Sequence, residues 1–215
     1  MKPDLKNIKN IIFDLGNVLL NLDFEASIKA FHKLGLGTNV LNKQQAYADP
    51  VFYELEMGKI TPENFRKRVR EILKNPDATD QQIDDAWSAM ILDIPASRVK
   101  LLKEISKNYN IYLFSNTNQI HIKKLHPAFV EQHGIEFPSL FDKDFYSYKI
   151  NARKPDLDSY LKVIDLAGIK PRETLFVDDL DKNIAAAQKV GLKTFWLKKG
   201  MELTEVFNRK VISVL

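Results

Sequence analysis

The sequence predicts an α/β protein with a Rossmann-like parallel sheet and a helical cap inserted after the first strand. Short apolar runs typical of buried strands recur along the chain, and amphipathic helical patterns separate the later ones. The stretch after the first run has helical patterns only. Strands that alternate with helices are joined by right-handed crossovers and form a parallel sheet. We therefore expect an α/β core in residues 1–20 and 96–215 and a helical cap in residues 21–95.

The predicted strands are short and continuously apolar. The first, Ile11–Phe13, has no alternation of polar and apolar residues, which favours a strand covered on both faces. Similar runs predict further strands at residues 111–114, 174–177 and 194–197. In an open parallel sheet, ligands bind beyond the carboxyl ends of the strands, so the residues that follow these runs are candidates for a site.

Two helices are predicted in the second half of the core. The first presents one apolar face, made of Leu157, Tyr160, Leu161 and Ile164. Gly168 supplies its stop. The second carries Ile184 and Ala187 and ends at Gly191, a residue type that favours the left-handed turn after a helix.

The predicted cap contains helical stripes and helix-start signals. Its first apolar stripe consists of Phe24, Ile28, Phe31 and Leu34. Thr61 and Pro62 start another helix, and Thr79 with Gln82 matches a capping box for a third. Because this segment leaves the core directly after the first strand, we expect it to cover the carboxyl ends of the strands as a lid.

Composition and charge exclude several classes of protein. The chain has 215 residues, 45% of them hydrophobic and 28% charged, which is typical of a globular protein with a sizeable core. The formal net charge is +4, but acidic and basic residues are interspersed, so we expect no nucleic-acid partner. With no cysteine, disulfides and thiolate chemistry are excluded, and the cytoplasm is the expected compartment. No secretory signal and no membrane helix are expected.

Polar side chains follow three of the apolar runs. Asp14, Ser115 and Asp178 each stand where a predicted strand ends, so they converge if these strands are neighbours. Lys154 lies between the last two in sequence. Asp178 is followed by a second acid, Asp179, and two adjacent carboxylates are costly without a cation. A carboxylate, a hydroxyl, a lysine and an acidic pair together suit phosphate chemistry.

Four segments in a fixed order resemble the motifs of the haloacid dehalogenase superfamily. They are Ile11–Val18 (IIFDLGNV), Leu113–Asn118 (LFSNTN), Arg153–Pro155 (RKP) and Phe176–Asp179 (FVDD). Within that superfamily the chain is similar to phosphatases with a helical cap of the first type, and the first two segments resemble bacterial alpha-D-glucose-1-phosphate phosphatases. The resemblance covers nearly the whole chain. It implies the fold of that superfamily and magnesium-dependent hydrolysis of a small phosphorylated metabolite.

The resemblance also implies a role for each matching residue. Asp14 would attack phosphorus and become an aspartyl phosphate. Ser115 would hydrogen-bond a phosphoryl oxygen, with Asn116 supporting the phosphate site, and Lys154 would neutralise both the nucleophile and the transferred group. In the cap, Glu56 is a candidate for binding sugar hydroxyls, although it also fits a plain helix end followed by a turn.

A magnesium site is implied at the same place. Its protein ligands would be Asp14, the main-chain carbonyl of Gly16 and Asp178, because Mg²⁺ prefers oxygen ligands and keeps several waters. Asp179 would support this site or orient Lys154. Asn183 either supports the site as well or only occupies the first turn of the following helix.

The chain departs from the family pattern at Gly16. Most phosphatases of this superfamily carry an aspartate there, which protonates the leaving group and later activates water. General acid–base catalysis contributes about 10²–10⁴-fold. We therefore expect a preference for leaving groups that need little protonation, such as an anomeric sugar oxygen or an acyl group. Asp23, Glu56 and His121 are the candidates for a replacement acid.

Three alternatives remain open at this point. A 2-haloacid dehalogenase uses the same nucleophile but no divalent metal, so the pair Asp178–Asp179 argues against it. A non-catalytic binding or regulatory module is supported by Gly16 alone. A hexose phosphate mutase would suffer more from the missing acid. The expected partner is a small phosphorylated metabolite, with the protein a monomer or homodimer.

Overall fold

The sheet is parallel and has five strands in the order β3-β2-β1-β4-β5. A computed structural model describes residues 2–207. The strands are β1 (Asn10–Phe13), β2 (Asn110–Ser115), β3 (Lys143–Tyr146), β4 (Thr174–Asp178) and β5 (Lys193–Trp196). The central strand β1 pairs with β2 on one side and β4 on the other, so the predicted parallel α/β sheet is confirmed.

The edge strand β3 was not predicted from the sequence. Its first two residues, Lys143 and Asp144, are exposed and partly exposed, whereas Phe145 and Tyr146 are buried. A four-residue strand that is half charged lacks the apolar run by which the other strands were recognised. Its pairing with β2 is a tertiary interaction, which a local pattern does not contain.

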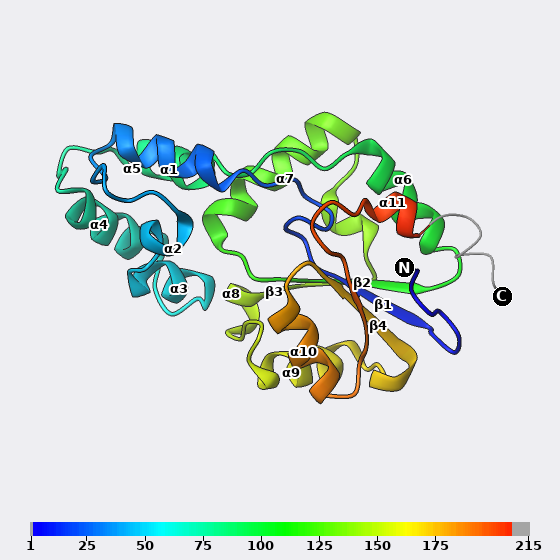
Figure 1. Cartoon of the computed structure of the whole chain (residues 1–215). Helices are drawn as coiled ribbons and strands as arrows, with labels where there is room; N and C mark the ends of the chain where they lie inside the picture. The colour runs from blue at the N-terminus through cyan, green and yellow to red at the C-terminus, as the bar shows by residue number, and fades with distance from the viewer. Residues whose placement is uncertain (1, 208–215) are drawn as a thin grey trace.

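Helices cover both faces of the sheet (Figure 1). The helices α6 (Ala96–Ile105), α7 (Gln119–His133) and α11 (Leu203–Val206) lie over one face, and α9 (Leu157–Ala167) and α10 (Asp181–Lys189) over the other. Ile11 and Phe13 join the apolar cluster of the first face, and Ile12 joins that of the second. The strand is thus buried on both faces, as its continuous apolar run predicts.

The predicted apolar face of α9 was partly wrong. Tyr160 and Val163 are buried against the sheet, while Leu157 and Leu161 are 42% and 51% exposed. The helix is rotated so that the aromatic ring of Tyr160 faces Phe114 and Phe176. The predicted stop is present, because Gly168 has the left-handed conformation, with φ of 65°.

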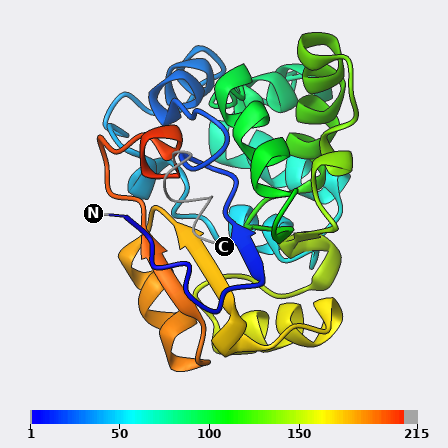
Figure 2. The ribbon, with the colours of Figure 1, turned by 90° about the vertical axis from the view of Figure 1, so that its right-hand side faces the viewer.

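The segment between β1 and α6 is helical throughout its regular structure. It comprises α1 (Phe24–Lys33), α2 (Lys43–Ala46), α3 (Pro50–Glu56), α4 (Pro62–Leu73) and α5 (Asp80–Ser88). Thr61 caps α4, and Thr79 forms the expected capping box on α5. These helices gather beyond one end of the sheet (Figures 1 and 2).

The cap has an apolar cluster of its own, built around Phe52, Phe65 and Trp87. It meets the cluster of the core at Leu22 and Ile91, which pack against both. Two separate clusters joined at the linkers support the proposed division into residues 1–20 with 96–215 and residues 21–95. Within residues 2–207, no helix combines the length and the apolar character that crossing a membrane requires.

Candidate active site

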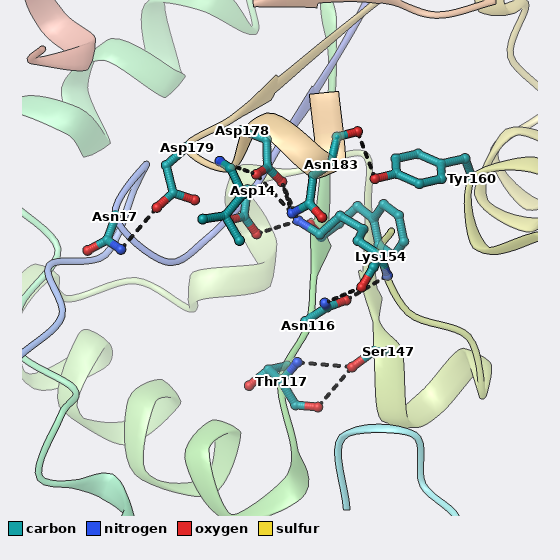
Figure 3. A network of polar contacts seen from close by, with 12 residues as sticks. Asp14, Asn17, Asn116, Thr117, Ser147, Lys154, Tyr160, Asp178, Asp179 and Asn183 are labelled. Carbon is teal, nitrogen blue, oxygen red and sulfur yellow. Dashed lines mark hydrogen bonds and ion pairs between the residues drawn. The ribbon is translucent and has the colours of Figure 1, made fainter. Parts of the chain in front are cut away.

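Three strand ends bring four polar side chains together. Asp14 follows β1, Ser115 ends β2 and Asp178 ends β4, and β1 lies between the other two strands. Lys154, from the loop before α9, places its Nζ 2.6 Å from Asp14 Oδ1 and 2.8 Å from Asp178 Oδ2 (Figure 3). Parallel strands that end at one edge of a sheet produce this convergence, as expected from the sequence.

Lys154 is held firmly although it lies in a loop. Its side chain is 1% exposed, and its Nζ also donates to the carbonyl oxygen of Phe114 at 2.9 Å. The Asn116 side chain hydrogen-bonds the backbone N–H and carbonyl of Lys154, at 2.9 and 2.8 Å. Thus the Asn116 amide positions the lysine. Ser115 lines the cavity, and its hydroxyl makes no hydrogen bond within residues 2–207, which leaves it available to a ligand.

Burial and charge act in opposite directions on this cluster. Burial raises the pKa of Asp14 to about 7, although Lys154 opposes the change. Burial alone would lower the pKa of Lys154, but the carboxylates of Asp14 and Asp178 outweigh it and raise that pKa above the ordinary lysine value. The ammonium is therefore charged, and the carboxylates around it gain from a further cation.

The acidic groups fit a magnesium ion. Oxygen atoms of Asp14, Asp178 and Asp179 lie within 4.8 Å of one another. This is an all-oxygen donor set with a net negative charge, which is the chemistry that Mg²⁺ requires. Burial raises the pKa of Asp179, although the hydrogen bond from Asn17 opposes the change. The main-chain carbonyl of Gly16 follows Asp14 by two residues and borders the same cavity.

Other side chains form hydrogen bonds to these acids and fix their positions (Figure 3). Asn183 is in the first turn of α10 and also donates to both Asp178 oxygens, at 2.9 and 3.0 Å. Asp178, and not Asp179, contacts Lys154. Asp179 instead accepts a hydrogen bond from Asn17 Nδ2 at 3.1 Å. The direct contact with Lys154 is thus made by Asp178, and the contact of Asp179 with Asn17 favours a role of Asp179 in supporting the metal site.

A cavity of about 440 Å³ lies between the core and the cap. We call its core side the floor, defined by Asp14, Ser115, Lys154 and Asp178, of which the first three line it directly. We call its cap side the roof, defined by Tyr53, Glu56 and Trp87. Glu56 thus shares one cavity with the predicted nucleophile, as a residue that binds the substrate must.

The space where the family's second aspartate would stand is partly filled. A Cβ atom added at Gly16 would approach Cδ1 of Leu22 to 2.8 Å, and no other residue outside its chain neighbours lies within 4 Å. Leu22 belongs to the linker that leads into the cap and packs against both apolar clusters. The missing acid therefore coincides with a linker leucine that approaches the floor closely.

Two of the three candidate replacement acids make other contacts and are poorly suited to protonate the leaving group. Asp23 caps α1 by accepting hydrogen bonds from the N–H groups of Glu25 and Ala26, and it does not line the cavity. His121 stacks on Trp87 and is paired with its carbonyl, and burial lowers the pKa of His121 to about 4. It is neutral near pH 7 and holds no proton to give from an imidazolium. Glu56 remains, and burial raises its pKa.

Several residues of the site were not singled out from the sequence. Asn17 was quoted within a motif but given no role. Its φ of 56° is in the left-handed region, where Asn is enriched, so the residue type is a signal in the sequence for this turn. Ser147 fixes the loop after β2 through both backbone groups of Thr117, at 3.0 Å each. Arg153 lines the cavity beside Lys154. Ser147 and Arg153 act through contacts between distant segments, which leave no local pattern.

Comparisons with known proteins agree with this geometry. A D-ribitol-5-phosphate phosphatase of Bacteroides thetaiotaomicron is 30% identical over 205 residues, covering 94% of this chain and 99% of the relative. A sesquiterpene phosphatase of Aspergillus oryzae is 29% identical over 193 residues, covering 86% and 87%. The model of the haloacid dehalogenase-like hydrolase family matches residues 8–191.

A solved structure extends the similarity to the fold. It is an enzyme of this family from Bacteroides thetaiotaomicron in complex with magnesium and inorganic phosphate. It is 35% identical, with a TM-score of 0.86, and the match covers 94% of this chain and all of the other. Magnesium is the ion that the acidic cluster of this chain suits. The chain belongs to the haloacid dehalogenase-like hydrolase family, and the prediction of a hydrolase is confirmed.

Proposed function

We propose that the protein is a magnesium-dependent phosphomonoesterase that hydrolyses a small phosphorylated sugar or polyol through an aspartyl-phosphate intermediate. The observation that carries this proposal is the floor of the cavity. There, one buried ammonium lies between two strand-end carboxylates, at 2.6 and 2.8 Å. Phosphoryl transfer needs mainly positioning and stabilisation of charge, and this arrangement supplies both.

Each step follows from the position of a side chain. Oδ1 of Asp14 contacts Lys154, and Oδ2 makes no hydrogen bond within residues 2–207, so Oδ2 is the atom we assign to the attack on phosphorus. The Ser115 hydroxyl and the Lys154 ammonium would bind the phosphoryl oxygens. The bond between Asp14 and phosphorus forms as the bond to the leaving oxygen breaks. Water then hydrolyses the acyl phosphate and regenerates the carboxylate.

Bound between Asp14, the carbonyl of Gly16, Asp178 and Asp179, Mg²⁺ would supply positive charge that reduces the repulsion between the nucleophile and the phosphate. The protein prepares this site by fixing the acids. Asn183 orients Asp178, and Asn17 orients Asp179. We propose Asp179 as a further ligand because its carboxylate lies in the same cluster. Within residues 2–207 the hydrogen bond that this carboxylate accepts from another side chain comes from the exposed Asn17.

The nature of the leaving group follows from Gly16. Without a carboxylate at this position, an anomeric oxygen or an acyl group leaves more readily than an alkoxide. We therefore propose an anomeric sugar 1-phosphate as the preferred substrate, in line with the resemblance to glucose-1-phosphate phosphatases. Relatives of about 30% identity are named for a polyol phosphate and for a sesquiterpene phosphate, so similarity alone does not select the substrate.

The alternatives differ in one measurable respect each. A 2-haloacid dehalogenase has no use for the acidic cluster, so EDTA would leave it active. A non-catalytic module would not turn over any phosphate ester. A catalytic role accounts for the buried Lys154–Asp14 contact, because a buried charged cluster costs more to desolvate than an apolar one.

The test is a screen of phosphorylated metabolites with Mg²⁺, including glucose 1-phosphate, glucose 6-phosphate, D-ribitol 5-phosphate and p-nitrophenyl phosphate. We expect turnover that EDTA abolishes and Mg²⁺ restores, and that Asp14→Asn removes. Activity unaffected by EDTA or retained in Asp14→Asn would disprove the phosphatase mechanism. A clear preference for glucose 6-phosphate over glucose 1-phosphate would disprove the anomeric preference alone.

The type of the cap, the cellular compartment and the oligomeric state also belong to this proposal. The cap is assigned to the first type because it is inserted between β1 and β2 and is wholly helical in its regular structure within the described residues. The cytoplasm is the proposed compartment, to be tested by cell fractionation. Sedimentation would decide between a monomer and a homodimer.

A further inference from the structure

An ion pair joins the cap to the loop that carries Lys154. Arg153 Nη2 lies 2.8 Å from Glu56 Oε2, at the carboxyl end of α3. The guanidinium also lies over the ring of Tyr53, 4.9 Å from its centroid. All three side chains line the same cavity as Asp14. The residue next to the catalytic lysine therefore faces the space that the leaving group must occupy.

This pair retains unused hydrogen-bonding capacity. Arg153 Nε is buried and has no hydrogen-bond partner. A buried donor without a partner costs free energy, and such groups in native structures usually await a ligand, water or ion. Oε2 of Glu56 contacts the guanidinium, and since a carboxylate has about four acceptor positions, Glu56 can accept a further hydrogen bond. The pair thus offers a donor and an acceptor side by side.

We propose that Arg153 and Glu56 form a subsite that binds hydroxyl groups of the leaving group, with Tyr53 as an apolar surface beside it. A hydroxyl group both donates and accepts, so it satisfies a neighbouring donor and acceptor together. This inference rests on the proposed phosphatase function and goes further by naming the residues that select the substrate. Arg153 is a new assignment, and Glu56 acquires a defined partner.

Charge determines what the subsite excludes. Because Glu56 neutralises Arg153, the partly buried pair favours a neutral polyhydroxy chain over one that carries a second anion. Lys43 and Lys182 also line the cavity, but both are exposed, so water and salt screen their charges. Removing the carboxylate should therefore free the guanidinium to attract an anionic leaving group. Removing the guanidinium should leave a carboxylate that repels it.

The experiment compares kcat/KM for two substrates with saturating Mg²⁺: D-ribitol 5-phosphate, whose leaving group is a neutral polyol, and 3-phosphoglycerate, whose leaving group carries a carboxylate. Each value is divided by kcat/KM for p-nitrophenyl phosphate, so that a general loss of activity caused by damage to the floor cancels. For Glu56→Gln we expect the polyol-to-carboxylate ratio to fall by about tenfold. For Arg153→Met we expect it to rise, because 3-phosphoglycerate loses more activity than the polyol phosphate.

Arg68→Met is the matched control. Arg68 forms an ion pair with Asp49 inside the cap, at 2.7 Å, and neither residue lines the cavity. Its ratio should equal that of the wild type. Equal ratios in wild type, Glu56→Gln and Arg153→Met would overturn the subsite and leave the pair as a cap anchor only. If Arg153→Met does not fold, Glu56→Gln decides alone. A wild type inactive on these three esters and on glucose 1-phosphate as well would instead refute the phosphatase function itself.

Discussion

The floor and the roof of the cavity differ in how firmly they are held. The floor residues Asp14, Ser115, Lys154 and Asp178 are all at most 8% exposed, and three of them stand at strand ends. In the roof, Trp87 is buried, but Tyr53 is 38% exposed and Glu56 is partly exposed. A rigid floor suits chemistry that needs fixed positions, whereas an accessible roof suits the selection of different leaving groups.

The two sides are also joined unequally around the rim. Near α5, Trp87 of the cap stacks on His121 of the core, 4.6 Å between ring centroids, and Leu22 and Ile91 continue the apolar contact. Near α3 the contact is polar, formed by Glu56 with Arg153 and by the Met57 carbonyl with Asn151. Both linkers between the core and the cap run on the apolar side of the rim, so that side anchors the cap. The polar side can exchange the partners of its ion pair and hydrogen bond.

Removing the ammonium of the floor should have the largest effect. In Lys154→Met the carboxylates of Asp14 and Asp178 lose their shared partner in a buried site. Breaking such a pair costs about 3–5 kcal/mol, which lowers Tm by roughly 10 °C in a chain of this size. We expect no detectable phosphatase activity, and a larger increase of Tm on adding Mg²⁺ than in the wild type.

Differential scanning calorimetry with and without Mg²⁺ provides this comparison. Lys107→Met is its control, because Lys107 is exposed and pairs with Glu104 at the surface. It should keep the wild-type Tm within about 1 °C, since exposed pairs contribute little. A Lys154→Met protein as stable as the wild type would contradict the view that Lys154 compensates the buried carboxylates of the floor.

Installing the missing acid should change the leaving-group preference. Gly16 does not have a positive φ, so its backbone accepts a side chain, and Cδ1 of Leu22 is the atom that stands in the way. The double variant Gly16→Asp with Leu22→Ala should raise kcat/KM for glucose 6-phosphate by about 10–100-fold relative to p-nitrophenyl phosphate, whose leaving group needs no proton.

Leu22→Ala alone is the control for this variant, and it should not raise that ratio. An unchanged ratio in the double variant would mean that another group already protonates the leaving oxygen. Glu56 would then be the group to test next, because it is the remaining candidate acid that lines the cavity.

The convergence of the floor was predictable from the sequence, whereas in the roof only Glu56 was a candidate and its pairing with Arg153 was not foreseen. Asp14, Ser115 and Asp178 follow apolar runs, and the rule that parallel strands present their ends at one edge brings them together. Arg153 and Glu56 are 97 positions apart and meet only because α3 folds over the loop before α9. The strand β3 and the rotation of α9 were also missed, since both depend on the neighbours that a segment acquires on folding.

A smaller effect is expected where Asn17 holds Asp179. Asn17 Nδ2 donates to Asp179 at 3.1 Å, and the residue is exposed with φ of 56°. Asn17→Gly keeps this backbone conformation and removes the hydrogen bond. Groups that orient metal ligands are worth about 10–100-fold in metal affinity, and an exposed contact belongs at the low end. We expect the Mg²⁺ concentration for half-maximal activity to rise about tenfold.

The matched control for Asn17→Gly is Asn7→Gly, because Asn7 also has a positive φ, of 62°, and lies outside the cavity. It should leave the Mg²⁺ dependence unchanged. If Asn17→Gly lowers activity equally at all Mg²⁺ concentrations, the asparagine acts on the floor in another way than through the metal ligand.

The last effect concerns the apolar side of the rim and appears only in acid. Burial lowers the folded-state pKa of His121 to about 4, below the ordinary value of 6.5. Between these two values the unfolded chain binds more protons than the folded one, so this residue reduces stability as pH falls from 6.5 to 4 and has no such effect above. His121 is only partly buried, so we expect a loss of about 2 kcal/mol.

In His121→Phe the ring can still stack on Trp87 but cannot be protonated. Urea unfolding at pH 7.5 and 4.5 should therefore show a smaller loss of stability in acid for this variant than for the wild type. His133→Phe is the comparison, because His133 lies on the same helix and its Nε2 donates to the Ile94 carbonyl, away from Trp87. An equal loss in wild type and His121→Phe would mean that acid weakens the molecule elsewhere, and that the apolar side of the rim is insensitive to pH.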